Sequence, residues 1–420
     1  MDALKRIEKE IKKCVKCGAC RAHCPVFREL KREPAVARGK LSLAKALLDG
    51  SLELDDRTYL DMSRCLLCGS CVEKCANEVP VDVIVMAARE ALARKRGLTS
   101  FHRAVGNVLR NRNLMKMGAN VASILGPLFM EKVPATSGLR LKFPLPFIDK
   151  KRVFPPIAAK PFLERHPEII PGEPDKPRVM FFVGCMTNFV YTGIGEAALA
   201  LLRHLGCTVL IPRDQQCCGL PGMSGGDMAT VRFLAEKNLE ALERFQADYI
   251  VTACATCGSA LHRFYPEIVG NRHPGLLQRL KAIAEKTVDA AVLMGELGLR
   301  PEETGAGEAI RITYHDPCHL RNRSITNQPR ELLRSVPGVS LTEMEGSEKC
   351  CGMGGTFSVY HYDTSMKINA VKSEAIAKTG AEAVATGCPG CIMHLSDGLK
   401  QRGLQIRAIH TLELLARRIH

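Results

Sequence analysis

Eight of the 19 cysteines fall in two copies of one spacing near the start of the chain. The spacing C-x2-C-x2-C-x3-C occurs first at Cys14, Cys17, Cys20 and Cys24, and again at Cys65, Cys68, Cys71 and Cys75. Thiolates at every third position let a tight turn reach three corners of an iron–sulfur cubane, and in two-cluster proteins the fourth cysteine ligates the other cluster. The spacing therefore predicts two cubane [4Fe–4S] clusters, one on Cys14, Cys17, Cys20 and Cys75 and the other on Cys65, Cys68, Cys71 and Cys24.

Paired zinc sites are the alternative interpretation of these eight cysteines. Zinc sites usually present two C-x2-C arms that lie about 12–20 residues apart. Each motif here instead places four cysteines within a span of 11 residues. This crowding favours iron–sulfur clusters over zinc.

Ten further cysteines form a second repeat in the rest of the chain. Each copy has one cysteine, a Cys-Cys-Gly 32 residues later and then a C-x2-C. The first copy is Cys185, Cys217, Cys218, Cys254 and Cys257, and the second is Cys318, Cys350, Cys351, Cys388 and Cys391. Gly219 and Gly352 would permit the sharp turn that adjacent cysteines need to reach one site. Five thiolates are one more than zinc or a plain cubane takes, which favours a cluster with a larger skeleton; one zinc with spare thiols is the alternative.

The composition is that of a folded protein with an unusual content of thiols. The chain has 420 residues, 46% of them apolar and none of them Trp, which is enough for about three domains without disulfide bonds. The first residues are charged and lack the apolar core of a secretory signal. The longest uncharged stretch in the middle, residues 117–130, is shorter than the roughly 20 residues of a membrane span. We therefore expect a cytoplasmic protein whose thiols bind metal or do redox chemistry.

The elements that position the cysteines follow from hydrophobic periodicity. Residues 38–50 and 81–96 have apolar side chains at helical spacing, so the first cysteine region is predicted to be helical. Beyond residue 178, short apolar runs lead to the cysteines and alternate with amphipathic stretches, which predicts parallel sheets with thiols beyond the carboxyl ends of the strands. The predicted architecture is an α-helical two-cluster domain (1–98), a basic linker or docking segment (99–177) and two repeated α/β cysteine-rich domains (178–305 and 306–420).

Positive charge is concentrated in the middle of the chain. The formal net charge is +15, and residues 86–178 hold 18 Lys/Arg against 7 Asp/Glu. Two interpretations are open: a solvated linker, or a strip that docks on anionic lipid or an acidic partner. The second would place the protein peripherally on the inner face of the cell membrane. Nucleic acid is not an expected partner, because the sequence has no DNA-binding motif and no basic patch interleaved with aromatic residues.

The two cysteine repeats together resemble a known family. The segments ARGKLSLAKALLDG, QCCGLPGMSGGD, YHDPCHL and CCGMGGTFSV are similar to those of tandem cysteine-rich "CCG" proteins. These include the catalytic subunit of heterodisulfide reductase and the iron–sulfur subunits of glycolate oxidase, lactate-utilisation dehydrogenases and anaerobic glycerol-3-phosphate dehydrogenase. The resemblance implies one or two non-cubane [4Fe–4S] clusters on the ten cysteines, held close to Gly219 and Gly352.

The resemblance also implies a function. We expect an iron–sulfur subunit of an FAD-linked dehydrogenase that oxidises glycolate or D-lactate, with the flavin on a partner subunit and a quinone or another respiratory acceptor. Reduction of a disulfide at the non-cubane clusters is the alternative, and a zinc-scaffolded interaction protein is the third. His315, Asp316 and His319 flank Cys318 and could supply protons or hydrogen bonds to a cluster, or could simply form a turn. His262 and His394 could likewise interact with a cluster or be ordinary polar residues. No catalytic residue is assigned.

Overall fold

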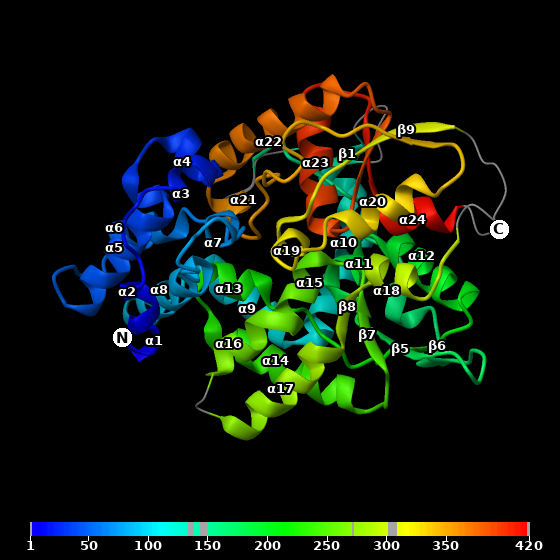
Figure 1. The fold of residues 1–420 in the computed structure, drawn as a ribbon, viewed down its shortest axis with the longest axis horizontal. Helices are drawn as coiled ribbons and strands as arrows, with labels where there is room; N and C mark the ends of the chain where they lie inside the picture. The colour runs from blue at the N-terminus through cyan, green and yellow to red at the C-terminus, as the bar shows by residue number, and fades with distance from the viewer. Residues whose placement is uncertain (1, 133–137, 143–148, 271–272, 301–308, 418–420) are drawn as a thin grey trace.

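The computed structural model describes residues 2–132, 138–142, 149–270, 273–300 and 309–417. Figure 1 shows the N-terminal part, in blue, against one side of a body whose lower half comes from the middle of the chain and whose upper half comes from the C-terminal third. The two halves of this body each contain a parallel sheet. The structure thus confirms a helical N-terminal region followed by two α/β units.

The N-terminal region consists of short helices around two longer ones. Its elements are α1 (Asp2–Lys5), α2 (Glu8–Lys12), α3 (Cys20–His23), α4 (Pro25–Leu30), the 3₁₀ turn η1 (Glu33–Ala35), α5 (Ala37–Leu48), α6 (Asp56–Ser63), α7 (Ser70–Glu73) and α8 (Val81–Arg96). The apolar positions predicted for α5 and α8, among them Leu41, Ala44 and Ile84, are buried in one core. These two helices form the frame from which the cysteine loops extend.

The first parallel sheet has the strand order β4-β6-β5-β7-β8, with only β4 antiparallel to its neighbour. Its strands are β4 (Ile169–Ile170), β5 (Arg178–Phe181), β6 (Thr208–Leu210), β7 (Tyr249–Thr252) and β8 (Thr287–Asp289). The helices around it are α11 (Gly184–Phe189), α12 (Thr192–His204), α13 (Leu220–Gly225), α14 (Met228–Glu243), α15 (Ala255–Ser259), the π-helical η3 (Ala260–Phe264), α16 (Tyr265–Val269), α17 (Pro274–Lys286) and α18 (Ala290–Glu296). Helices on both faces explain the near-continuous apolar sequence of β5 and β7.

The second sheet repeats this plan with the order β10-β9-β11-β12, all parallel. Its elements are β9 (Ile310–Tyr314), α19 (Cys318–Arg321), α20 (Asn327–Arg334), β10 (Val339–Leu341), α21 (Phe357–Tyr360), α22 (Tyr362–Lys378), β11 (Ala383–Thr386), α23 (Pro389–Gln401), β12 (Arg407–His410) and α24 (Thr411–Ala416). Backbone hydrogen bonds fix the correspondence of the two copies. Phe182 N donates to Val251 O in the first, and His315 N donates to Ala385 O in the second.

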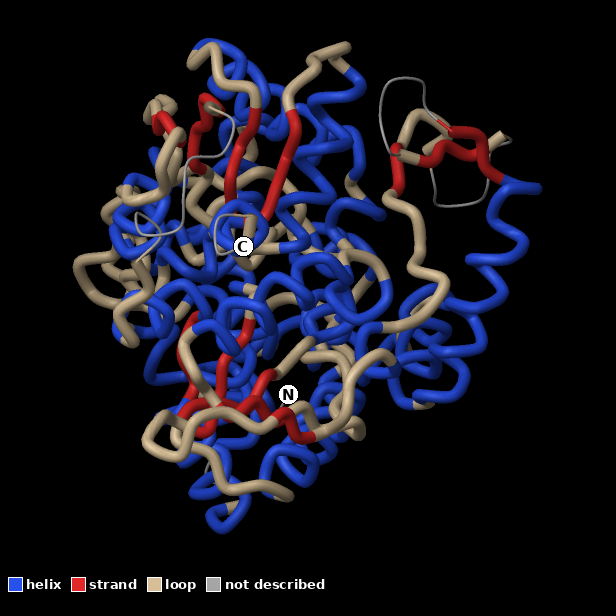
Figure 2. Tube along the Cα trace, turned by 90° about the vertical axis from the view of Figure 1, so that its right-hand side faces the viewer, coloured by secondary structure: helices blue, strands red, loops and turns tan. Residues whose placement is uncertain are grey.

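Residues between the N-terminal region and the first sheet form structure of their own. This segment contains α9 (Ser100–Arg110), α10 (Arg112–Phe129), an antiparallel sheet of β1 (Met130–Lys132), β2 (Leu139–Leu141) and β3 (Val153–Phe154), and the turn η2 (Phe162–Glu164). Figure 2 shows the small sheet at upper right, beyond the end of α10.

The sequence predicts a linker or docking strip for residues 99–177. The described parts of this segment pack against both cysteine-rich units. Helix α9 packs on α13 and α14, and the buried Arg152 donates to the carbonyl and hydroxyl of Ser358. Ion pairs with Asp214 and Glu164 balance the charges of Arg112 and Lys116. Among the helices that the structure describes, none combines the length and apolarity that crossing a bilayer requires.

Candidate metal centres

The two N-terminal cysteine motifs adopt the same loop conformation. Lys16 and Gly18 have φ values of 58° and 86°, and the equivalent Leu67 and Gly69 have 54° and 70°. Such left-handed residues turn the backbone sharply. Each loop therefore curls in the same way around the space between its first three thiols.

The fourth cysteine of the first motif lies with the second motif. Cys24 lines one pocket with Cys65, Cys68 and Cys71. Burial raises the pKa of Cys24 to about 12, and the neighbouring Cys68 and Cys65 add to the rise. Near the other end, Asn77 Nδ2 donates to Lys13 O at 2.8 Å, which ties the residues after Cys75 to those before Cys14. Cys24 therefore lies where the predicted exchange of fourth ligands requires it, and the exchange by Cys75 stays a prediction.

The two loops differ in what covers them. Val15 in the first loop is 70% exposed and Cys17 is exposed, whereas the equivalent Leu66 is 5% exposed. The second loop is covered by the residues around α19. Asn322 Nδ2 donates to Cys68 O at 3.2 Å, and Arg321 donates to Ser70 Oγ at 2.8 Å.

The side chain of His319 adds a third contact at this junction. Its Nε2 lies 3.3 Å from Leu67 O and its Nδ1 lies 3.1 Å from Thr256 Oγ1. Because a carbonyl only accepts, Nε2 carries the proton in this contact. The ring therefore connects the N-terminal region with both cysteine-rich units, a role that the sequence did not reveal.

The ten cysteines of the second repeat line one shared cavity of about 330 Å³. The sequence predicts a separate cysteine edge on each domain. In the structure the two edges face each other, and Ala255 N donates to Gly387 O across the junction at 3.2 Å. Cys68 of the N-terminal region lines the same cavity. The predicted sets are thus brought together, and they are also brought to the second N-terminal loop.

Neighbouring thiols form a continuous row through this cavity. Each cysteine contacts the next in the following row: Cys185, Cys217, Cys218, Cys257, Cys254, Cys388, Cys391, Cys351, Cys350, Cys318 and Cys68. The Sγ atoms of Cys185 and Cys217 are 3.5 Å apart, and those of Cys351 and Cys391 are 3.7 Å apart. All 19 cysteines are free thiols. The two sets meet where Cys254 contacts Cys388.

A glycine directs each Cys-Cys pair into the cavity. Gly219 and Gly352 have φ values of 84° and 99°, a conformation that side chains other than that of glycine rarely adopt. Their amides donate to Cys217 Sγ at 3.5 Å and Cys350 Sγ at 3.4 Å. The expected sharp turn is present in both copies, and it brings backbone donors to the sulfur atoms.

Adjacent thiols in each pair shift each other's pKa in opposite directions. The hydrogen bond from the preceding thiol lowers the pKa of Cys218 and of Cys351 well below the ordinary value. The pKa of Cys217 and of Cys350 is raised well above it, mainly by the hydrogen bonds with the first cysteine of each set. Metal ligands must be thiolates. The two copies therefore have the same electrostatic pattern at their Cys-Cys pair.

Buried cations lie beside the thiols, and their positive charge indicates whether these sites can hold negatively charged metal–thiolate groups. Lys40 donates to two backbone carbonyls at 2.8 Å, Arg89 to four backbone carbonyls, and Lys372 to two. Burial lowers the pKa of Lys40 and of Lys372 to about 8, against the opposing effect of nearby cysteines. A buried cation needs a counter-charge, and metal-bound thiolates supply one. The donor sets and the cations both fit iron–sulfur clusters.

The remaining polar candidates separate into different roles. Asp316 forms a buried ion pair with Arg330 at 2.6 Å. His394 Nε2 lies 3.0 Å from Ser365 Oγ, and His262 is exposed. Cys207, outside both repeats, is fully buried in an apolar core. His315 lies against two cysteines of the second set.

Comparisons with known proteins match this arrangement. A 4Fe-4S dicluster domain family matches residues 10–79, and a cysteine-rich domain family, CCG, matches residues 179–262 and again 312–396. A probable glycolate oxidase iron-sulfur subunit of Bacillus subtilis is 29% identical over 97% of this chain and 94% of its own length. A subunit of the fumarate reductase (CoM/CoB) of Methanothermobacter marburgensis is 29% identical over 97% of this chain and 72% of its own length.

A shorter relative and one solved structure complete the comparison. Lactate utilization protein A of Exiguobacterium sp. is 32% identical over 57% of this chain and 97% of its own length. The crystal structure of a hypothetical protein from Helicobacter pylori aligns with 100% of this chain and 76% of its own, with a TM-score of 0.52 and 10% identity. The last likeness concerns the fold alone.

Proposed function

Because this chain belongs to the family of iron–sulfur proteins that join a 4Fe-4S dicluster domain to paired cysteine-rich CCG domains, we propose that it is the electron-transfer subunit of an FAD-linked 2-hydroxy-acid dehydrogenase. Its partner would be a flavin subunit that oxidises glycolate or D-lactate, and the final acceptor a quinone or another respiratory carrier. The glycolate oxidase and lactate-utilisation relatives support this substrate class.

The observation that carries this proposal is the graded burial of the thiol sets. The first loop exposes Cys17 and Val15 to solvent. The second loop lies under α19, and Cys68 contacts Cys318 and Cys350 in the inner cavity. The thiols therefore lead from an exposed face to a buried centre, which is the layout that exchange of electrons with a docked protein needs.

The residues of this chain hold and insulate the proposed groups. When bound, [4Fe–4S] clusters supply reversible one-electron chemistry. The cysteines of the N-terminal region would hold two cubanes, and the ten CCG cysteines one or two non-cubane clusters. Leu66 and the residues around α19 keep water from the second loop, while Lys40 and Arg89 balance the thiolate charge. The region with the two cubanes would be residues 1–98, and the CCG units residues 178–305 and 306–420.

The exposed loop also suggests how the flavin partner docks. Lys12, Lys13 and Lys16 lie in or next to the first loop and are exposed. Lys12 and Lys13 pair with Glu8 and Glu10, so Lys16 supplies the positive charge beside Cys17. A partner with an acidic rim around its flavin would complement it. Peripheral contact of residues 99–177 with the inner membrane surface is a separate part of the proposal, and it would bring the acceptor side close to quinone.

Anaerobic purification, alone and together with the proposed flavin subunit, tests the proposal. Iron and acid-labile sulfide should be present, and glycolate or D-lactate should bleach the visible absorbance only when the flavin subunit is added. Replacement of Cys17 by serine should slow this reduction by the partner. Cys207→Ala is the matched control, since that thiol lies outside every set. Reduction that is equally fast in C17S, or absent with both substrates, would reject the proposal.

Disulfide reduction is the second candidate, favoured by the single cavity that both CCG sets share. Apolar side chains, including Phe101 and Val359, line it beside the thiols, so an organic disulfide could lie between the sets. The reaction would consume two electrons and two protons and yield two thiols. The dithionite-reduced protein should then be reoxidised by a disulfide and release free thiol. The absence of thiol release would exclude this alternative.

A further inference from the structure

The two CCG sets have the same backbone but differ at one buried position. Phe182 follows β5 and His315 follows β9, and both side chains are fully buried. Their amides make the equivalent hydrogen bonds, to Val251 O and Ala385 O. The first set therefore has a benzyl ring where the second set has an imidazole. This difference is invisible in the cysteine pattern, which is complete in both copies.

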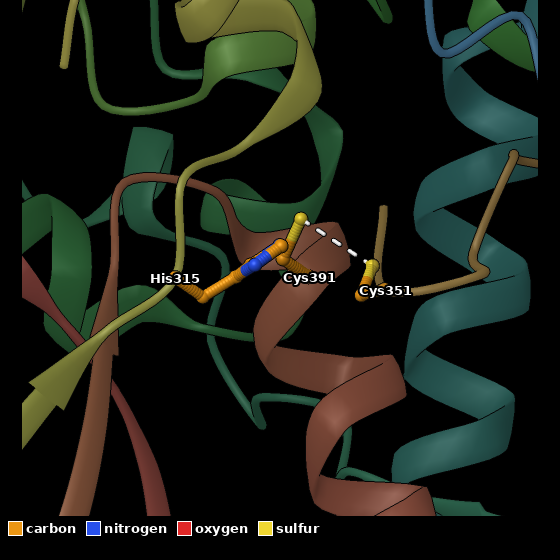
Figure 3. Close-up of side chains that lie close together, drawn as sticks. All are labelled: His315, Cys351 and Cys391. Carbon is orange, nitrogen blue, oxygen red and sulfur yellow. Dashed lines mark hydrogen bonds between the residues drawn. The ribbon is translucent and has the colours of Figure 1, made fainter. Parts of the chain in front are cut away.

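His315 lies against the thiols of the second set. One ring nitrogen and the Sγ atoms of Cys351 and Cys391 all lie within 4.8 Å of one another. Figure 3 shows the ring extending from the end of β9 toward Cys391 on α23, with Cys351 on the facing loop. Three elements that are far apart in sequence thus converge on one point.

Neither nitrogen of His315 has an oxygen or nitrogen hydrogen-bond partner among the described residues, and its nearest polar neighbours are thiols, of which Cys351 is close enough for a hydrogen bond. A buried imidazole with only a weak thiol partner is unfavourable, because it loses the stronger hydrogen bonds that water provides in the unfolded chain. The phenyl ring of Phe182 at the equivalent position has no such requirement. The imidazole at this position therefore retains a nitrogen for a stronger partner, and the neighbouring thiols indicate a metal centre.

We propose that His315 is a sixth protein donor of the second CCG set and binds iron through a ring nitrogen, so that this centre is a mixed nitrogen–sulfur site and the first is an all-sulfur site. The inference rests on metal binding by the ten cysteines and not on the substrate of the complex. Its geometric basis is the trio of His315, Cys351 and Cys391.

A nitrogen donor changes the electronic properties of the second centre. The ring nitrogen of His315 would be an added neutral ligand, whereas the first centre has no donor at the position of Phe182. The two centres should therefore differ in reduction potential. The charge of the buried Lys372, which lies near Cys351, Cys318 and Cys350, favours the reduced form of the second centre.

Pulsed EPR on the iron-loaded full-length chain tests the proposal directly. The protein is prepared once with natural histidine and once with 15N-labelled histidine. A hyperfine coupling of the strength found for a nitrogen bonded to iron should be present, and it should change with the isotope. His315→Phe, which copies the first set, should abolish this coupling and shift the potential of one centre. The reciprocal F182H should leave the coupling from His315 in place.

His394→Gln is the matched control, because His394 is buried near Gly352 but already has Ser365 as a partner. It should retain the nitrogen coupling. The inference is overturned if the wild-type protein shows only the weak coupling of a hydrogen-bonded nitrogen, or if H315F keeps the strong coupling. If H315F loses iron, His315→Cys, which restores a donor, should load and lack the nitrogen signal; a strong nitrogen coupling in H315C would also refute the inference. Zinc in place of iron at this set in wild-type protein would overturn it as well.

Discussion

Replacing Gly69 by alanine should destabilise the protein more than the same replacement at Gly18. Both glycines occupy the equivalent position of a cysteine loop, and their φ values are 70° and 86°. Alanine in such a conformation costs about 1–2 kcal/mol, and this strain is common to both. The pair therefore isolates what the surroundings of the second loop contribute.

The surroundings differ sharply. A Cβ at Gly69 would lie 2.0 Å from Asn322 Nδ2, whereas at Gly18 the nearest atom is the end of the flexible Arg38 side chain, at 3.0 Å. Asn322 would have to move and give up its hydrogen bond to Cys68 O. The lost bond and the displaced packing add about 2–3 kcal/mol. We expect a total loss of about 3–5 kcal/mol for G69A, against about 1–2 kcal/mol for G18A.

The free energy of unfolding can be measured anaerobically in urea. Far-UV circular dichroism is the suitable signal, because the chain has no Trp, and the loss of visible absorbance reports on the centres separately. Asn322→Ala removes the obstacle, so G69A in the N322A background should cost no more than G18A does. Equal destabilisation by the two alanine variants would show that the second loop does not lie against α19. Failure of N322A to rescue would show that Asn322 is not the obstacle.

Three other outcomes follow from charge and burial. Lys40→Met should lower the potential of the centre on the second loop by tens of millivolts, since a nearby unit charge contributes about 1–2 kcal/mol at an effective dielectric of about 20; K45M, on the exposed side of the same helix, should leave an EPR-monitored redox titration unchanged. Burial lowers the pKa of His102 to about 4, with a smaller effect of the charge of Arg89. As the pH falls below about 6.5, His102 is therefore protonated in the unfolded chain before it is protonated in the folded protein. The free energy of unfolding that the neutral His102 contributes above that pH is lost as the pH approaches 4. His102→Gln should remove about one proton from the uptake on unfolding over this range, and an unchanged slope of stability against pH would contradict the assignment. If residues 99–177 dock on anionic lipid, binding of the protein to phosphatidylserine vesicles should weaken as salt rises, and salt-insensitive binding, or none, would reject that contact.

Local patterns in the sequence were enough to predict those parts of the site whose geometry depends on a few neighbouring residues. The spacing of the first motif predicts the placement of Cys24 with the second loop, and the apolar runs before Cys185 and Cys318 predict strands that end at the thiols. The sequence also indicates the burial of the second loop, because Leu66 and Leu67 occupy the positions that Val15 and the exposed Lys16 occupy in the first loop. These signals act over a few residues, so a sequence displays them.

What the sequence did not predict depends on how the units dock. The shared cavity requires the cysteine edges of two sheets to face each other, and this contact is made by scattered polar residues such as His319 and Asn322. A polar side chain at the end of a short helix looks the same in a sequence whether it faces water or another domain. The middle segment was interpreted from its charge, yet the ion pair of Arg112 with Asp214 and the hydrogen bond of the buried Arg152 to Ser358 hold it against its neighbours.

Both duplications in this chain preserve the ligands and vary what surrounds them. The two N-terminal loops share their turn geometry, but one is open to solvent and the other is covered by α19. The two CCG sets share five thiols and a glycine turn, but one has Phe182 and the other His315 beside the sulfur atoms. Because the residues around a ligand set its charge, solvation and hydrogen bonding, ligand sets with the same cysteines can give bound centres of different potential. An ordered transfer of electrons requires such differences, and in this chain they would arise from single positions outside the cysteine pattern. A variant that exchanges those positions, and leaves every cysteine in place, should therefore change the order of potentials without changing the iron content.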